Sequence, residues 1–319
     1  MKVRWISVGL AVAALGVAPP AAGFCRTSAC ELGEEERVNE GGKACTRDAH
    51  ECVTEGNRLH WGSPCLTYAV QRDGSPAAGI SAEEFQALVE QAFLAWEQVS
   101  CPGGGSPRFH AQYQGLVSCH RREAVCGTAD KNVNVMMLHD SEWPDAPSTI
   151  GLTRPSGGTV SGLVLDTDLE INSQDYDFSL GATGPSALDL SQVLAHEVGH
   201  FLGLSHSDFL GALMSKDYAS LQLSRELITS DDIAAICEAY PPGPALSCPA
   251  PPPPAYDTCQ VTPGQQQDCV LPSMTHDHKS SGCSMGPSHS SGLASAGSAS
   301  LLAVLLGLAR RRRQRTTRR

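Results

Sequence analysis

The chain has 319 residues, enough for one good-sized core with appendages or for two small domains. Nine of its 23 basic residues lie at the two ends (Lys2, Arg4 and seven arginines from Arg310 onward), which leaves 14 basic against 34 acidic residues between them, a net charge of −20. This acidic body argues against nucleic-acid binding and leaves room for bound cations, although a solvated acidic surface is the simpler explanation.

Residues 1–23 have the layout of a secretory signal peptide. Lys2 and Arg4 precede an apolar run from Ile6 to Val17, and residues 21–23 place small side chains before a cleavage site. The run is too short for a transmembrane helix. We therefore expect signal cleavage and export.

Thirteen cysteines in an exported chain indicate disulfides rather than metal thiolates, and no CxxC pair suggests a zinc ribbon. Twelve of them lie between Cys25 and Cys269, an even number, so we expect all twelve to be paired. Cys119 and Cys126 are close enough in sequence to predict a local bridge. Cys283 stands outside this set.

The predicted elements start with a cysteine-containing segment, residues 24–57, that has too few apolar residues for its own core. A strand over 66–70 follows, and then a helix that Ser81 caps. Apolar residues recur in that helix at three- and four-residue steps: Phe85, Leu88, Val89, Ala92, Phe93 and Trp96.

Further along, four stretches have the composition of strands: 109–116, 133–138, 148–153 and 162–165. The Pro-Ser-Gly-Gly sequence at 155–158 predicts a turn between the last two.

Two more helices are expected before the domain ends. Asp189, with Gln192 three residues on, predicts a capping-box-like helix start, and Gly203 suits its left-handed end. The last helix runs from Ser230 to Tyr240, where two prolines stop it. Strands interspersed with three helices indicate an α+β domain over residues 58–241.

The decisive motif reads HEVGHFLGLSH, from His196 to His206. Residues four apart share one face of a helix, so His196 and His200 present two imidazoles to one ion. Gly203 lets the chain turn, which brings His206 to the same ion. Three protein ligands leave one coordination position for water, as in catalytic rather than structural zinc sites.

Glu197 follows the first histidine and faces the open position without binding the metal. Zinc would polarise the scissile carbonyl and acidify the water, while Glu197 takes the proton and passes it to the leaving amine. The alternative is three satisfied histidines on a buried helix. It requires five fixed positions to coincide by accident, in fewer than about one chain in ten thousand.

The pattern HExxHxxGxxH followed by a Met-turn resembles the metzincin peptidases, and residues 211–215 resemble that turn, with Met214 beneath the metal. Ser207, directly after the third histidine, resembles the matrixin branch. Three further stretches are similar to matrixins: 93–99, 165–170 and 227–240. The resemblance covers about residues 60–241. It implies a metzincin-like catalytic domain with one zinc, three helices, and a twisted, mostly parallel sheet with an antiparallel edge strand.

The resemblance also implies where ligands lie. Protein or peptide substrates would join the sheet edge at Ser148–Thr153, and residues 218–227 would line a specificity pocket. Three acidic residues after the fifth strand are candidates for calcium, although an exposed acidic strand end explains them as well: Asp166, Asp168 and Glu170. The histidines of a second zinc are not evident, since only His139 lies near the right place. No cysteine-switch motif lies upstream.

Two functions fit the motif. One is an active surface protease, and the other is a non-catalytic zinc-containing surface module for binding or adhesion. Glu197 favours the enzyme, because a structural site has no need of a carboxylate beside an open coordination position.

The C-terminal part changes in composition. Residues 242–292 are a proline-rich linker and a polar, cysteine-containing tail, and residues 293–319 are an apolar run ending in arginines. A plain membrane anchor is one explanation, and a soluble tail would expose an apolar patch. The residues around Cys283 resemble the C-terminal sorting tails of myxobacterial surface proteins. That resemblance implies cleavage and lipidation near Cys283, and hence membrane association at the outer cell surface.

Overall fold

The computed structural model describes the chain over seven ranges: 23–32, 44–124, 129–158, 160–181, 188–216, 228–260 and 270–271. The predicted signal peptide up to residue 22 and the predicted sorting tail, including Cys283, lie outside these ranges. Within them, no helix has both the length and the apolar character needed to cross a membrane.

The centre of the described domain is a seven-stranded sheet with the order β3-β2-β4-β6-β5-β9, in which β1 also pairs with β6. Its strands are β1 (His60–Trp61), β2 (Cys65–Gln71), β3 (His110–Val117), β4 (Val135–Leu138), β5 (Gly151–Gly158), β6 (Leu163–Ile171) and β9 (Val270–Leu271). All pairs are parallel except β5 with β6. This confirms the predicted α+β class with a mostly parallel sheet.

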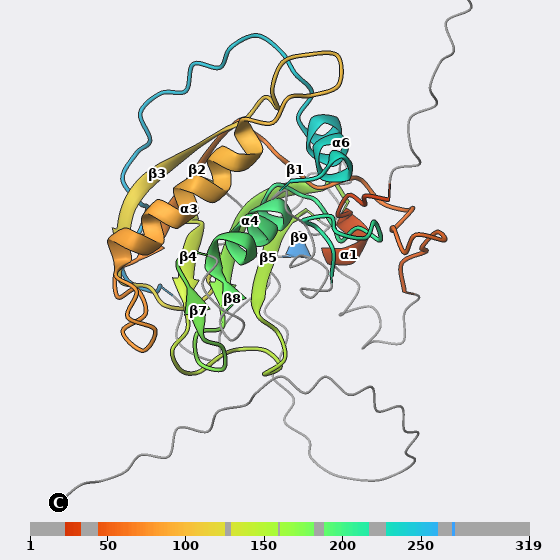
Figure 1. Ribbon diagram of the computed structural model, residues 1–319. Coiled ribbons are helices and arrows are strands. Elements are labelled where there is room, and N and C mark those ends of the chain that lie inside the picture. The colour runs from red at the N-terminus through yellow and green to blue at the C-terminus, as the bar shows by residue number, and fades with distance from the viewer. Residues whose placement is uncertain are drawn as a thin grey trace, which may run out of the picture.

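Among the described residues, three helices are longer than two turns: α3 (Ala82–Glu97), α4 (Leu190–Phe201) and α6 (Ser230–Ala239). Figure 1 shows α3 and α4 side by side across one face of the sheet. The short elements are α1 (Ala29–Leu32), the 3-10 turn η1 (Ala129–Lys131), and the pair β7 (Phe178–Ser179) and β8 (Leu188–Asp189).

The ends of the helices follow their capping residues. Ser81 and Glu84 form the reciprocal capping box at the start of α3. Asp189 caps α4 through the Ser191 amide, 3.0 Å away, but the predicted box with Gln192 is absent, because Gln192 Oε1 has no hydrogen-bond partner. The cap alone therefore begins the zinc-motif helix.

Both faces of the sheet are buried, and strand β4 is apolar on both sides. In β4, Met136 and Leu138 join the core under the helices, whereas Val135 and Met137 join a second cluster on the opposite face. On the helix side, Phe93 stacks on Tyr68 and meets Phe201 edge-on. These contacts pack α3 against both the sheet and α4.

Strand β5 corrects one prediction. The turn expected at 155–158 is wrong: β5 continues through Gly158 with a register shift after Ser156, and the chain reverses before Gly162, which has φ +73°. Proline is tolerated in β5 because that strand lies at the sheet margin. β5 is thus the predicted antiparallel edge strand, except that β9 pairs with Gly157 and Gly158.

The residues before β1 do not form a separate unit. We call residues 23–32 and 44–57 the lead-in segment. Two disulfides hold it, Cys25–Cys52 and Cys30–Cys45, as the cysteine content predicted. Its first residue, Gly23, donates its amide proton to the buried carboxylate of Asp231 in α6, at 2.7 Å. The lead-in segment is therefore packed onto the catalytic domain.

The proline-rich residues also belong to the domain. Residues 241–260, which we call the proline strap, run from α6 around the β3 side of the sheet (Figure 1). Gln112 and Gln114 of β3 donate side-chain hydrogen bonds of 3.0 Å to the carbonyls of Pro249 and Pro252. The strap is extended, as predicted, but it packs along β3 from residue 242 onward, and the chain pairs with the sheet again at β9.

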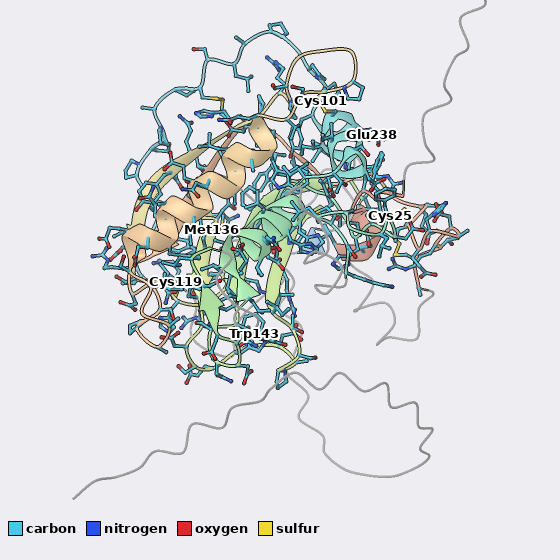
Figure 2. The ribbon with its side chains drawn as sticks, viewed as in Figure 1. Cys25, Cys101, Cys119, Met136, Trp143 and Glu238 are labelled. Atoms are coloured by element: carbon cyan, nitrogen blue, oxygen red, sulfur yellow. A yellow bond between two sulfur atoms is a disulfide. The ribbon has the colours of Figure 1, made fainter. Side chains whose placement is uncertain are left out.

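Disulfides close the strap onto the sheet. Cys248 bonds to Cys65 at the start of β2, and Cys259 bonds to Cys119 after β3. The predicted Cys119–Cys126 bridge is therefore wrong, because tertiary packing brings Cys259 closer than the local sequence suggested. Cys126 and Cys269 lie outside the described residues. Figure 2 shows Cys119 and Cys25 on opposite sides of the sheet, so cross-links hold both flanks of the domain.

Candidate metal centre

Helix α4 sets the position of the first two histidines. Its buried face carries His196, and Trp96 of α3 donates its indole proton to the Ala195 carbonyl at 2.8 Å. His200 follows one turn later on the same side. The helix is thus locked beside α3 at the residues that present the imidazoles.

The third histidine arrives on a tight turn. Gly203 has φ +86°, the left-handed conformation expected at the end of a helix, and its amide donates to the His200 carbonyl at 2.9 Å. The chain then reverses through Leu204 and brings His206 to the same point. This confirms the role assigned to Gly203 from the sequence.

The three imidazoles converge. His196, His200 and His206 each offer a ring nitrogen, and these nitrogens all lie within 4.8 Å of one another. His200 Nε2 is 3.3 Å from His206 Nε2. Two nitrogens bound to one tetrahedral zinc at 2.0–2.1 Å lie about 3.3 Å apart. The donor set and its spacing therefore fit zinc.

Backbone carbonyls fix the tautomers of two of these rings. His196 Nδ1 is 2.6 Å from the Leu213 carbonyl, and His200 Nδ1 is 2.9 Å from the Leu204 carbonyl. Because a carbonyl only accepts, each Nδ1 carries the proton and each Nε2 keeps its lone pair. Both histidines are thus oriented as metal ligands by their surroundings.

Burial also keeps the histidines neutral. It lowers the pKa of His196 to about 4 and that of His200 to about 3, and the neighbouring imidazole adds to each fall. Burial, the neighbouring His200 imidazole and Lys216 together lower the pKa of His206 to about 3. Neutral imidazoles have the protonation state that metal binding requires.

Glu197 lies beside the cluster with a defined partner. Its side chain is buried, and Thr153 of β5 donates a hydrogen bond of 2.6 Å to its Oε2. Burial raises the pKa of Glu197 to about 7, which the Thr153 hydroxyl opposes. A carboxylate with a pKa near neutrality has the property expected of a general base. A Cβ atom at Gly151 would overlap the Glu197 side chain, so a larger residue there would displace the carboxylate.

The predicted Met-turn lies under the helix. Met214 is buried, and a Cβ atom at Gly199 would overlap its sulfur, so the turn packs directly against α4. Asp232 of α6 accepts hydrogen bonds from the amides of Leu213 and Met214, at 2.8 and 3.0 Å. Leu213 in turn holds His196, and α6 therefore supports the first ligand through the turn.

The acidic residues of β6 are not an exposed strand end. Asp166, Asp168 and Glu170 are buried on the sheet face away from α3 and α4. Asp168 accepts from the amides of Glu123 and Val135, and Glu170 pairs with His139 at 3.0 Å. The three carboxylates are not among the described groups close enough to share one ion. Neither Asp166 oxygen has a hydrogen-bond partner among the described residues.

Two other clusters in the described ranges combine a glutamate with two cysteines, but those cysteines form the disulfides Cys30–Cys45 and Cys119–Cys259. Disulfide sulfurs are not the thiolates that bind metals. The histidine cluster is thus the metal centre that the described part of the chain supports. The predicted pocket residues 218–227 lie outside it.

Sequence reasoning did not find two residues of this centre. Thr153 was expected only as part of an edge strand, and Asp232 only as part of a helix that resembles the matrixins. Neither has a local signal, because each acts across a distance of 18 or more residues.

Comparisons with known proteins agree with this geometry. A family model described as Matrixin matches residues 145–241, from before β5 to the end of α6. Metalloendoproteinase 1-MMP of Arabidopsis thaliana is 39% identical over 72 residues, 22% of this chain and 19% of the relative. Interstitial collagenase of Sus scrofa is 27% identical over 201 residues, which are 61% of this chain and 36% of the relative. Karilysin of Tannerella forsythia is 33% identical over 87 residues, which are 27% of this chain and 16% of the relative.

A helix–turn histidine triad above a Met-turn defines a zinc metallopeptidase of the metzincin type. Within that class, residues 145–241 match the family model described as Matrixin. The chain spans between 16% and 36% of the length of the relatives named above.

Proposed function

We propose that the chain is an exported zinc-dependent endopeptidase with one catalytic ion at His196, His200 and His206 and with Glu197 as general base. The observation that carries the proposal is the joint geometry: three neutral imidazoles spaced for one tetrahedral ion, and a buried carboxylate from the same helix beside them. A structural zinc site has no use for that carboxylate.

The residues divide the chemistry among them. When bound, zinc supplies the Lewis acidity that polarises a scissile carbonyl and lowers the pKa of water to about 7. Glu197 takes the proton from the attacking water and returns it to the departing amine. Thr153 orients the Glu197 carboxylate through Oε2, which leaves Oε1 for the proton transfer. His206 is the most exposed ligand, and water and substrate therefore approach from its side.

Substrate would bind as an added strand along β5. Over Gly151–Ser156 the other side of β5 has no strand partner among the described residues, and Thr153 links this stretch to Glu197. An extended peptide paired there would carry its backbone past the histidine cluster. The proposed substrates are protein or peptide segments in extended conformation.

Casein hydrolysis tests the proposal. We expect the purified protein to cleave this unstructured substrate, to lose that activity with a zinc chelator, and to regain it when zinc is restored. Activity that survives full removal of zinc would exclude the proposed mechanism. Zinc binding without any hydrolysis would support the alternative, a non-catalytic surface module.

Export and surface retention form a second part of the proposal. Five disulfides among the described residues and the match of residues 145–241 to the Matrixin family model support an extracellular protein. We propose that residues 1–23 are removed as a signal peptide, which would also remove the Gly23 amide that contacts Asp231, and that residues 293–319 direct sorting. The tail would be cleaved near Cys283, which stays as the attachment point at the outer surface. Only residues after β9 would then act as the spacer.

Peptide mapping of the mature protein tests the tail. We expect peptides up to the neighbourhood of Cys283 and none from Leu293 onward, because a sorting tail is removed. Intact peptides beyond Leu293 in membrane fractions would instead identify a plain transmembrane anchor.

Of the calcium candidates Asp166, Asp168 and Glu170, we keep Asp166 as the proposed ligand, because its two carboxylate oxygens have no hydrogen-bond partner among the described residues. Burial and the nearby Asp168 carboxylate raise the pKa of Asp166, which Arg122 opposes, and a bound cation would offset that cost. We expect calcium at 100 times its dissociation constant to stabilise the protein by about 2.7 kcal/mol, measured by thermal unfolding, and to have no effect on Asp166→Asn. If calcium leaves the wild type unchanged and Asp166→Asn melts higher, Asp166 is simply protonated.

A further inference from the structure

The turn that carries His206 has its backbone partner in the lead-in segment. Thr27 donates its amide proton to the Gly203 carbonyl at 3.0 Å, and Ser205 donates to the Cys25 carbonyl at 2.9 Å. Arg26 and Leu204 face each other as an antiparallel bridge. The two segments, which lie almost 180 residues apart in the sequence, thus form a short antiparallel ladder next to the metal centre.

One carbonyl in this ladder serves two donors. Leu204 O accepts His200 Nδ1–H at 2.9 Å and also the Thr27 hydroxyl at 3.0 Å. A carbonyl oxygen has two lone pairs, so both are used. The carbonyl that fixes the tautomer and ring angle of the second ligand is therefore itself held by Thr27.

Arg26 also stabilises this turn, through hydrogen bonds from its guanidinium group. Its buried side chain donates from Nε to the Gly203 carbonyl at 3.3 Å and from Nη2 to the Leu59 carbonyl at 3.0 Å. The end of α4 collects carbonyl groups without helical partners, where a cation is favourable. Arg58 donates a hydrogen bond to the Arg26 carbonyl at 3.2 Å, and the disulfide Cys25–Cys52 holds the residue directly before Arg26.

We propose that Thr27, with Arg26 beside it, is a positioning residue of the zinc site, through which the lead-in segment sets how tightly the metal is held. The inference rests on the proposed function, because it requires zinc at the three histidines. Neither residue touches the ion. Thr27 acts through Leu204 O on His200, and Arg26 acts through Gly203 O on the turn that leads to His206.

The test is zinc affinity, measured by competition with a chromophoric chelator on the full chain. Groups that orient a metal ligand typically contribute 10- to 100-fold to affinity. We expect Thr27→Val, which keeps the shape but loses the hydroxyl, to bind zinc about tenfold more weakly, and Thr27→Ser to bind normally. Thr54→Ala is the matched control: its hydroxyl also donates to a backbone carbonyl within the lead-in segment, that of Thr46, but far from the turn.

Thermal unfolding with and without zinc separates positioning from simple stability. Loss of a purely structural contact would lower both melting temperatures equally, whereas the proposal requires the gap between them to narrow in Thr27→Val. Arg26→Lys, which keeps the charge but loses the two-carbonyl fork, is the second variant and should also weaken zinc binding. Wild-type zinc affinity in both Thr27→Val and Arg26→Lys would overturn this inference but leave the proposed function standing. A wild type that binds no zinc would overturn the proposed function as well.

Discussion

Replacing Glu197 with Gln will remove most peptidase activity while zinc stays bound. The amide cannot accept the proton of the attacking water, and general acid–base groups contribute about 10²- to 10⁴-fold to rate, or roughly 3–5 kcal/mol of transition-state stabilisation. Gln has nearly the same shape as Glu. Its amide oxygen can still accept the hydrogen bond that the Thr153 hydroxyl donates to Glu197 Oε2 in the wild type. Steady-state kcat/KM on a peptide substrate, together with metal analysis, measures both quantities.

Glu90→Gln is the matched control, since it makes the same chemical change at an exposed position of α3. That variant should keep wild-type activity. Wild-type-like turnover in Glu197→Gln would show that proton transfer lies elsewhere, and loss of zinc would show that Glu197 supports the metal rather than the reaction.

Replacing His206 with Ala will lower zinc occupancy instead. The remaining pair on α4 offers two ligands where a catalytic site uses three. Structural sites with four ligands hold zinc by about 10–16 kcal/mol, so one ligand is worth on the order of 3 kcal/mol, a hundredfold or more in affinity. Metal analysis after dialysis against a weak chelator measures the loss.

His110→Ala provides the comparison, because His110 is an exposed histidine that pairs with Glu97 on the surface. Its zinc content should match the wild type. Full zinc retention in His206→Ala would mean that the third ligand is misassigned.

The metal centre was predictable because most of it is local. His196, His200 and the left-handed Gly203 follow from helix periodicity and from the conformational freedom of glycine, which depend on a few neighbouring residues. Thr153 and Thr27 were not predictable, because each meets the centre through the tertiary fold. Thr27 lies 177 residues from Leu204.

The fold shows the same division between local and distant causes. Ser81 and Glu84 cap α3 as predicted, since the box needs four consecutive residues. The Cys119–Cys126 bridge failed, because the true partner, Cys259, is 140 residues away. Asp166 lies at a strand position where exposure depends on what covers the far face of the sheet, and strand alternation alone does not reveal that.

The strap disulfides have a mechanical consequence for a protein held by its C-terminus. Tension applied to the tail would first pull on the pair of β9 with β5 and, once that pair opens, would pass from Cys259 through the disulfide to Cys119. The covalent path therefore bypasses everything between those two cysteines, which includes α4, the Met-turn and α6. Beyond Cys119 the pull would pass to β3, while the segment that carries the three histidines lies off the covalent path and bears no tension along the chain.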